Sequence, residues 1–283
     1  MLRPNQRETS VVVADNVRLA ARIEAPPQTR GCIVISHGFG EHCGRYNKLI
    51  HTLTGIGLTT VRYDLRGHGN SGGKRGHAST YDVYLDDLAQ IVELARDVSP
   101  NLPTFLFGHS LGGGLVLNYA LRRGGNFSGV IALSPWLRLA FQPSAWKVML
   151  AKTVAGIMPS MSKPTDLDVS MLSHDPEVAK NYAQDPLTNP VMSAAAFLAL
   201  VNAGEYALAH ANALRLPLLL MHGGDDAVTD VRASEAFFAA AGAADKTFKR
   251  WDGMYHETLN EIGSAAVYQS IVDWLTPRLA TAI

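Results

Sequence analysis

Two serines of this 283-residue sequence lie in the pattern Gly-x-Ser-x-Gly, which can present a serine hydroxyl as a nucleophile. The pattern is short enough to arise by chance, so its context has to decide. Ser71 lies in a glycine-rich polar loop, with no strand directly before it and no helix directly after it. Ser110 follows the apolar run 104–107 and leads into a helical pattern at 111–122. Strand, sharp turn and helix are the context that the motif requires, so we expect Ser110 to be the nucleophile.

A serine hydroxyl needs a base, and the base needs a carboxylate that orients it. Asp226 follows the expected strand 217–221, and His256 follows the expected last strand 247–251. This chain order of nucleophile, acid and histidine is typical of hydrolases that carry serine on such a turn. We therefore expect His256 to act as general base and Asp226 to fix its tautomer, with Asp225 and Asp230 as alternatives for the acid.

A negative oxygen that forms during acyl transfer also needs hydrogen-bond donors. The backbone N–H of Leu111 lies at the expected start of a helix, where donors are unsatisfied and the helix dipole favours negative charge. A His-Gly turn at 37–38 follows the strand 32–36, and such a turn can supply a second amide, here that of Phe39. We expect these two amides to form an oxyanion hole, in which one donor is typically worth about 10²–10³ in rate.

The elements that must position these residues alternate along the chain. A strand pair at 11–13 and 18–23 flanks the turn Asp15-Asn16, and apolar strands then alternate with helical patterns. The expected strands are 32–36, 58–63, 104–107, 130–133, 217–221 and 247–251, and the expected helices are 46–56, 81–98, 111–122, 231–240 and 265–275. This alternation predicts an α/β fold with a mostly parallel sheet and helices on both faces. Ligands of such sheets bind beyond the carboxyl ends of the strands.

Residues 136–214 interrupt the alternation. They contain no convincing strand, and prolines cut them into short helical patterns. We expect a helical cap here, inserted into a core made of residues 1–135 and 215–283. The helical pattern at 145–158 is apolar nearly all round, and five of the chain's eight methionines lie in the insertion. This pattern predicts a surface that faces an apolar ligand, with ordinary packing beneath the insertion as the alternative.

The composition limits which ligands and which cellular locations we expect for this chain. The 25 basic and 25 acidic residues cancel, which argues against a nucleic-acid partner and favours a small, roughly neutral ligand. Two cysteines give no disulfide framework, and no metal-binding spacing of histidines or cysteines occurs, so we expect neither metal nor cofactor. No signal-peptide pattern opens the chain, and no apolar run reaches the roughly 18 residues of a membrane span. We expect a cytoplasmic protein, with peripheral membrane contact as an open alternative.

Several longer motifs carry a family resemblance across nearly the whole chain. They are HGFGEHCGRY at 37–46, DLRGHGNS at 64–71, the turn at 108–112, HGGDD at 222–226 and YHE at 255–257. With these motifs the chain resembles the monoacylglycerol lipase and lysophospholipase branch of the α/β-hydrolases, and the sequences DPE at 175–177 and DPL at 185–187 are similar to its bacterial members. The resemblance implies a serine esterase that removes one fatty acyl group from a glycerol headgroup through an acyl-enzyme on Ser110.

The resemblance also implies roles for polar residues beside the nucleophile. Glu41 and Arg45 would shape the headgroup end of the pocket, or alternatively form an ion pair that holds the oxyanion turn. In mammalian members a further histidine, three residues after the catalytic one, contacts glycerol, whereas this chain has Leu259 there. The identity of the substrate headgroup therefore stays open.

Other functions remain as alternatives. A lysophospholipase or a broad carboxylesterase uses the same residues, and a thioesterase or acyltransferase is also compatible with them. Dehalogenases and epoxide hydrolases place an aspartate where this chain has Ser110. A non-catalytic binding protein on the same fold is disfavoured because the nucleophile, acid and base positions are all filled.

Overall fold

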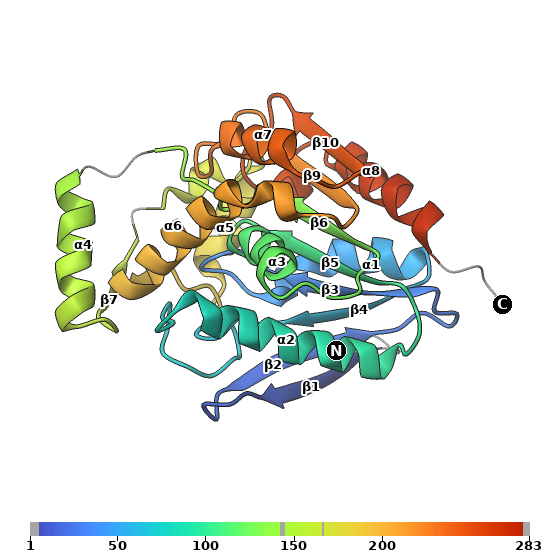
Figure 1. The fold of residues 1–283 in the computed structure, drawn as a ribbon, viewed down its shortest axis with the longest axis horizontal. Helices are drawn as coiled ribbons and strands as arrows, with labels where there is room; N and C mark the ends of the chain where they lie inside the picture. Colours follow the sequence, from blue (N-terminus) through green and yellow to red (C-terminus); the bar gives the residue numbers. More distant parts are fainter. Residues whose placement is uncertain (1–5, 142–144, 166, 280–283) are drawn as a thin grey trace.

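The computed structural model describes residues 6–141, 145–165 and 167–279, and its centre is an eight-stranded sheet (Figure 1). The strand order is β1-β2-β4-β3-β5-β6-β9-β10. The strands are β1 (Gln6–Val12), β2 (Arg18–Glu24), β3 (Gly31–Ser36), β4 (Leu58–Tyr63), β5 (Thr104–His109), β6 (Gly129–Leu133), β9 (Leu218–Gly223) and β10 (Lys246–Trp251). β1 and β2 pair antiparallel, β2 joins β4 antiparallel, and the other pairs are parallel.

Helices cover both faces of this sheet because its central strands are apolar on both sides. In β3, Cys32 and Val34 pack into one buried cluster, and Ile33 and Ile35 pack into the other. The first cluster is covered by α2 (Tyr81–Val98), α3 (Leu111–Arg122) and α7 (Val231–Ala240), and the second by α1 (Asn47–Gly55) and α8 (Ala265–Leu275). The predicted α/β class, with a mostly parallel sheet and helices on both faces, is confirmed.

Short 3₁₀ helices connect these elements at several points. They are η1 (Cys43–Tyr46), η2 (Val169–Met171), η3 (Ala211–Ala213), η4 (Thr258–Asn260) and η5 (Thr276–Arg278). The expected helix at 46–56 therefore begins one residue later, directly after η1. In the first hairpin, Asn16 takes the turn conformation with φ of 61°, which asparagine tolerates better than most residues.

The segment between β6 and β9 contains three longer helices and two short strands. The helices are α4 (Ala145–Ile157), α5 (Pro176–Gln184) and α6 (Ala194–Ala209). β7 (Ser162–Pro164) and β8 (Val191–Ser193) pair antiparallel, so the expectation of no strand in this segment was wrong. Strands of three residues are too short to show an alternating pattern.

The three helices of this segment are placed differently. α6 packs on α3, and Asn118 Nδ2 of α3 donates to the Ala203 carbonyl at 3.1 Å. α4 lies at the edge of the molecule, at the end away from α8 (Figure 1). Within the described ranges, no helix combines the length and the apolar character needed to cross a membrane.

Candidate active site

Ser110 occupies the sharp turn between β5 and α3. Its backbone has φ of 55° and ψ of −117°, a conformation that costs energy for a residue with a side chain. A Cβ at Gly108 would lie 2.0 Å from the Gly112 carbonyl oxygen, and one at Gly112 would lie 2.1 Å from the Ser36 oxygen. Glycine is therefore required at both positions. The Ser110 amide donates to the Leu133 carbonyl at 2.9 Å, which fixes the turn against β6.

His256 and Asp226 meet beyond the ends of β9 and β10. His256 Nδ1 lies 2.7 Å from Asp226 Oδ2, and both side chains are buried. A carboxylate accepts here, so Nδ1 carries the proton and Nε2 has its lone pair available for a proton from another group. The amides of Val228 and Thr229 donate to the other carboxylate oxygen at 2.7 and 2.9 Å. The loop backbone thus fixes the carboxylate that orients the imidazole.

The charge on Asp226 is strongly favoured. Burial alone would raise the pKa of its carboxyl group, because a buried charge loses hydration. The facing charge of His256 and hydrogen bonds from His256 and His222 outweigh burial and hold the pKa below its usual range. Asp226 therefore stays ionised near neutral pH, as the orienting partner of a general base must.

The alternative residues lie elsewhere or have other contacts. Asp225 is exposed, and Asp230 accepts from the Arg232 amide at 3.0 Å at the start of α7. Ser71 is buried, where its hydroxyl donates to the Asp64 carbonyl at 2.5 Å and accepts from the Ala20 amide at 2.8 Å. Ser71 is therefore part of a structural turn, and the structure brings Asp226, not its neighbours, to His256.

The turn at 37–40, which we call the oxyanion turn after its expected role, approaches the start of α3 at Ser110. A Cβ on Gly38 would lie 3.1 Å from the Ser110 Cβ, so only glycine allows the turn to come this close. The Gly38 amide donates to Glu41 Oε1 at 2.6 Å, which fixes the turn. Phe39 follows on the wall of the same cavity as Ser110, and Leu111 begins α3.

A cavity of about 550 Å³ opens over Ser110 and His256. Much of its wall is apolar and comes from the segment between β6 and β9, including Leu172, Met192 and Phe197. Trp146, Leu150 and Val154 form a stripe of α4 that also lines it. The structure thus places one stripe of the apolar pattern 145–158 along the cavity, where Trp146 and Leu150 stay more than half exposed, and not under a packed core.

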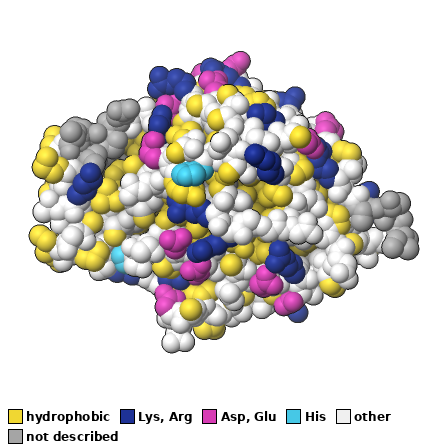
Figure 2. Space-filling model, in the orientation of Figure 1, with side chains coloured by type: hydrophobic (Ala, Val, Ile, Leu, Met, Phe, Trp, Pro, Cys, Tyr) yellow, Lys and Arg dark blue, Asp and Glu magenta, His cyan; other side chains and the backbone are white. Residues whose placement is uncertain are grey.

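The other side of α4 is exposed. Met149 is 68% exposed and Ile157 is 76% exposed, and Met158 and Met161 follow them at the surface. Figure 2 shows hydrophobic side chains gathered at this end of the molecule. Exposed apolar side chains in such numbers mark a contact surface in most proteins. We call Met149, Ile157, Met158 and Met161 the apolar tip.

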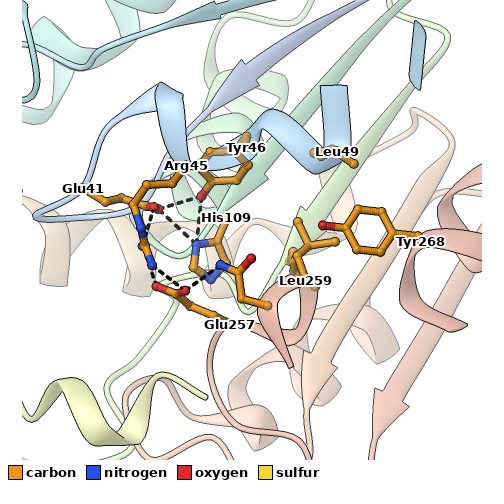
Figure 3. Close-up of a pocket in the computed structure, with 10 residues that line it drawn as sticks. Glu41, Arg45, Tyr46, Leu49, His109, Glu257, Leu259 and Tyr268 are labelled. Carbon is orange, nitrogen blue, oxygen red and sulfur yellow. Dashed lines mark hydrogen bonds and ion pairs between the residues drawn. The ribbon is translucent and has the colours of Figure 1, made fainter. Parts of the chain in front are cut away.

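A buried ion-pair cluster, drawn in Figure 3, lies next to the cavity that Ser110 lines. Arg45 Nη1 donates to Glu41 Oε2 at 2.8 Å, and Arg45 also donates two hydrogen bonds to the Glu257 carboxylate at 2.7 and 2.8 Å. Tyr46 donates to Glu41 Oε1 at 2.6 Å. Burial would raise the pKa of Glu41, but the Arg45 charge holds it well below its usual range. The cluster joins the oxyanion turn to the loop of His256, which is the ion-pair role considered for Glu41 and Arg45.

His109 and Leu259 complete the surroundings of this cluster. Burial would lower the pKa of His109, but the hydrogen bond and charge of Glu41 raise it above its usual value. Leu259 is buried and lines a small cavity of about 20 Å³ together with Glu41 and Arg45 (Figure 3). That volume is close to the space that one water molecule needs.

Comparison with known proteins decides the family. The hydrolase family described as serine aminopeptidase S33 matches residues 27–263. The chain belongs to this family. It is 31% identical over 281 residues to the monoacylglycerol lipase of Mycolicibacterium smegmatis, covering 99% of this chain and 100% of the relative. It is 34% identical over 285 residues to the human monoglyceride lipase, covering 99% of this chain and 93% of that protein.

A solved structure agrees with these relatives. The crystal structure of Paleococcus ferrophilus monoacylglycerol lipase is 34% identical, has a TM-score of 0.84, and covers 93% of this chain and 99% of its own. This S33-family chain therefore lies in the monoacylglycerol lipase branch of the α/β-hydrolases, as its motifs implied.

Two buried contacts of this α/β-hydrolase were not expected from its sequence. Glu257 is the second partner of Arg45, from which it is separated by 212 positions. His222 Nε2 lies 3.1 Å from Asp226 Oδ2, a partner that the sequence did not specify. Glu257 directly follows His256 in the chain, and His222 lies four residues before Asp226. This proximity in sequence is the local feature that could have indicated the two contacts.

Proposed function

We propose that this α/β-hydrolase cleaves monoacylglycerols to a free fatty acid and glycerol, with Ser110, His256 and Asp226 as its catalytic residues. The observation that carries the proposal is the position of Ser110 and His256 in the wall of one large apolar cavity. The cavity offers an apolar surface for one acyl chain, and the relatives named monoacylglycerol lipase support the headgroup.

The reaction has two halves. Ser110 Oγ attacks the ester carbonyl carbon while His256 Nε2 takes its proton, and the carbonyl oxygen becomes an oxyanion held by the amides of Phe39 and Leu111. Collapse breaks the ester bond, His256 returns the proton to the glycerol oxygen, and the acyl group stays on Ser110. Water then attacks the acyl-enzyme with His256 again as base, which frees the fatty acid and restores the serine.

Residues 136–214 form the cap of this enzyme in our proposal. Their walls enclose the acyl chain, because α4 and the residues around β7 and β8 line the cavity opposite Ser110. Within the cap, Tyr182 donates to the Gly40 carbonyl at 3.0 Å, so this part of the cap is tied to the oxyanion turn.

We further propose that the apolar tip docks on a lipid surface, from which the substrate enters the cavity. Lys152 on α4 and Lys163 on β7 lie exposed near the tip. Apolar side chains beside lysines are suited to the boundary between acyl chains and anionic headgroups.

The family description also suggests a peptidase, but the contacts of the cavity carboxylates disfavour that activity. An aminopeptidase needs a carboxylate for the ammonium group of its substrate. The cavity carboxylates Glu41 and Glu257 are both paired with Arg45. All four of their carboxylate oxygens already accept hydrogen bonds from the protein, so neither carboxylate is available to bind a peptide ammonium group.

Substrate comparison tests the proposal. Initial rates are measured on a long-chain monoacylglycerol, on the matching lysophosphatidylcholine and on a short nitrophenyl ester. We expect the highest kcat/KM on the monoacylglycerol. Equal values on all three would make the enzyme a broad carboxylesterase, and a preference for lysophosphatidylcholine would make it a lysophospholipase.

A further inference from the structure

Asp226 is held by two imidazoles, and only one of them is the proposed base. His222 Nε2 lies 3.1 Å from Asp226 Oδ2, the same oxygen that His256 Nδ1 contacts at 2.7 Å. The side chains of His222 and Asp226 are both 0% exposed. A histidine at this depth, in contact with the orienting acid, is placed to act on the chemistry.

The surroundings of His222 fix which nitrogen carries its proton. Nδ1 lies 2.8 Å from the hydroxyl of Ser234 on α7, and a hydroxyl can donate to it. Nε2 lies near three oxygens that can accept a hydrogen bond: Asp226 Oδ2, the Thr229 carbonyl oxygen at 3.2 Å and the Thr229 hydroxyl oxygen at 3.3 Å. The neutral ring that satisfies both sides therefore has its proton on Nε2 and accepts from Ser234 at Nδ1.

We propose that His222 is a positioning residue. Its Nε2–H donates a hydrogen bond to Asp226, which fixes the carboxylate and weakens the negative charge that Asp226 presents to His256. Asp226 Oδ2 then accepts from His256, from His222 and, at 2.9 Å, from the Thr229 hydroxyl. The proposal rests on the proposed roles of Ser110, His256 and Asp226, and adds a residue that touches none of the reacting atoms.

The proposed hydrogen bond from His222 should affect how readily His256 takes up a proton. A carboxylate that accepts more hydrogen bonds spreads its charge over more donors and stabilises a facing imidazolium less. Removing the His222 donor leaves Asp226 more negative toward His256, so the imidazolium form of His256 is favoured. His256 then loses its proton only at higher pH, and the acidic limb of kcat/KM against pH moves upward.

Other charged groups near this pair have to stay unchanged in the test. His256 faces Asp226 and the ring of His109, whose centroid lies 4.8 Å away, and Glu257 follows it in the chain. Asp230, at the start of α7, is a further carboxylate within electrostatic range of His222. Variants at His222 alone keep all of these groups in place, so a shift between them reports the His222 donor.

The experiment compares pH profiles of three single variants in the full chain. His222→Leu removes the donor, His222→Gln keeps an amide N–H in its place, and His210→Leu makes the same change at an exposed histidine outside the network. For His222→Leu we expect kcat to fall about tenfold and the acidic limb to rise by about half a pH unit or more. His222→Gln should recover most of both, and His210→Leu should match the parent enzyme.

Melting temperature and fluorophosphonate titration show how much of each variant is folded and active. If His222→Leu fails to fold, Ser234→Ala is tested in its place. This variant removes the hydroxyl that fixes the His222 tautomer, so we expect the acidic limb of kcat/KM to move upward by less than about half a pH unit. An unshifted profile in an active variant, or a shift to lower pH, would overturn the proposal. If the parent enzyme does not react with the fluorophosphonate, the catalytic roles on which this proposal rests are wrong.

Discussion

At the scale of single residues, Arg45 holds together the loops that carry the candidate catalytic groups. Its single positive charge bridges the carboxylates of Glu41 on the oxyanion turn and Glu257 beside His256, and all three side chains are largely buried. Removing one partner of a buried ion pair leaves an uncompensated charge in a medium that hydrates it poorly. The stability of the site therefore depends on this arginine more than on the exposed ion pairs.

Arg45→Met should lower the free energy of unfolding by about 3–5 kcal/mol, measured by urea denaturation at pH 7. The matched control is Arg138→Met, since Arg138 makes a two-point ion pair with Glu205 in which both side chains are about half exposed. The control should lose only a small fraction of that stability, because exposed pairs contribute little. Equal losses in the two variants would contradict a special role for the buried cluster.

At the scale of elements, the turn at Ser110 depends on close contact between β5, α3 and β3. Gly112→Ala would push a methyl group against the Ser36 carbonyl oxygen, which is backbone and cannot move aside. We expect a loss of about 3 kcal/mol or more in unfolding free energy, together with most of the esterase activity. Thermal unfolding and fluorophosphonate labelling measure the two effects.

Gly55→Ala is the control for that variant. Gly55 ends α1, and a Cβ there would meet nothing within 4 Å. This change should stabilise the fold by about 0.5–1 kcal/mol, because alanine has less freedom to lose on folding. If Gly112→Ala were as harmless as Gly55→Ala, the close contact at the Ser110 turn would not constrain the site.

Charged residues in the apolar tip should weaken binding to lipid vesicles. The double variant Met149→Glu and Ile157→Glu should bind vesicles of phosphatidylcholine and phosphatidylglycerol at least about tenfold more weakly in a sedimentation assay. Hydrolysis of a short soluble ester should be unchanged, because neither side chain lines the cavity. Val12→Glu on β1 places the same charge at another exposed apolar position and should bind like the parent. Unchanged vesicle binding by the double variant would rule out the tip as the docking surface.

Sequence patterns predicted the repeating elements well and the irregular contacts poorly. The bounds of α2, α3, α7 and α8 match the expected ranges, since each has a long amphipathic or apolar pattern. β7 and β8 were missed because three residues show no period. The partnership of Arg45 with Glu257 depends on how distant loops meet at the sheet's end, which no local pattern records.

At the scale of the whole molecule, several buried carboxylates link stability to pH. The carboxyl groups of Asp226, Asp64 and Glu41 all have pKa values held below their ordinary 3.8 or 4.5, against the opposing effect of burial. Between the lowered folded pKa and the ordinary unfolded pKa, only the unfolded chain binds the proton. Acid therefore favours unfolding in that range, and the stabilisation is fully present only above the unfolded values.

Urea denaturation at a series of pH values measures this linkage. We expect the free energy of unfolding to fall already between pH 6 and 5, because burial holds the pKa of His37 and His68 below the ordinary 6.5, so that mainly the unfolded chain takes up these protons. Below about pH 4.5 the carboxylates add to the fall, by about 1.4 kcal/mol per pH unit for each proton taken up. Asp226→Asn removes one of these groups and should make the fall less steep. A free energy that stays constant from pH 5 to 3 would contradict the ionised state of the buried carboxylates.

Covalent labelling by a long-chain alkyl fluorophosphonate tests the central claim most directly, because it reports the activated serine itself. Peptide mass mapping of the labelled chain should place one adduct on Ser110. Ser71→Ala, which changes the other Gly-x-Ser-x-Gly motif, should label like the parent, and Ser110→Ala should not label. An adduct on another residue, or labelling that survives Ser110→Ala, would contradict Ser110 as the nucleophile.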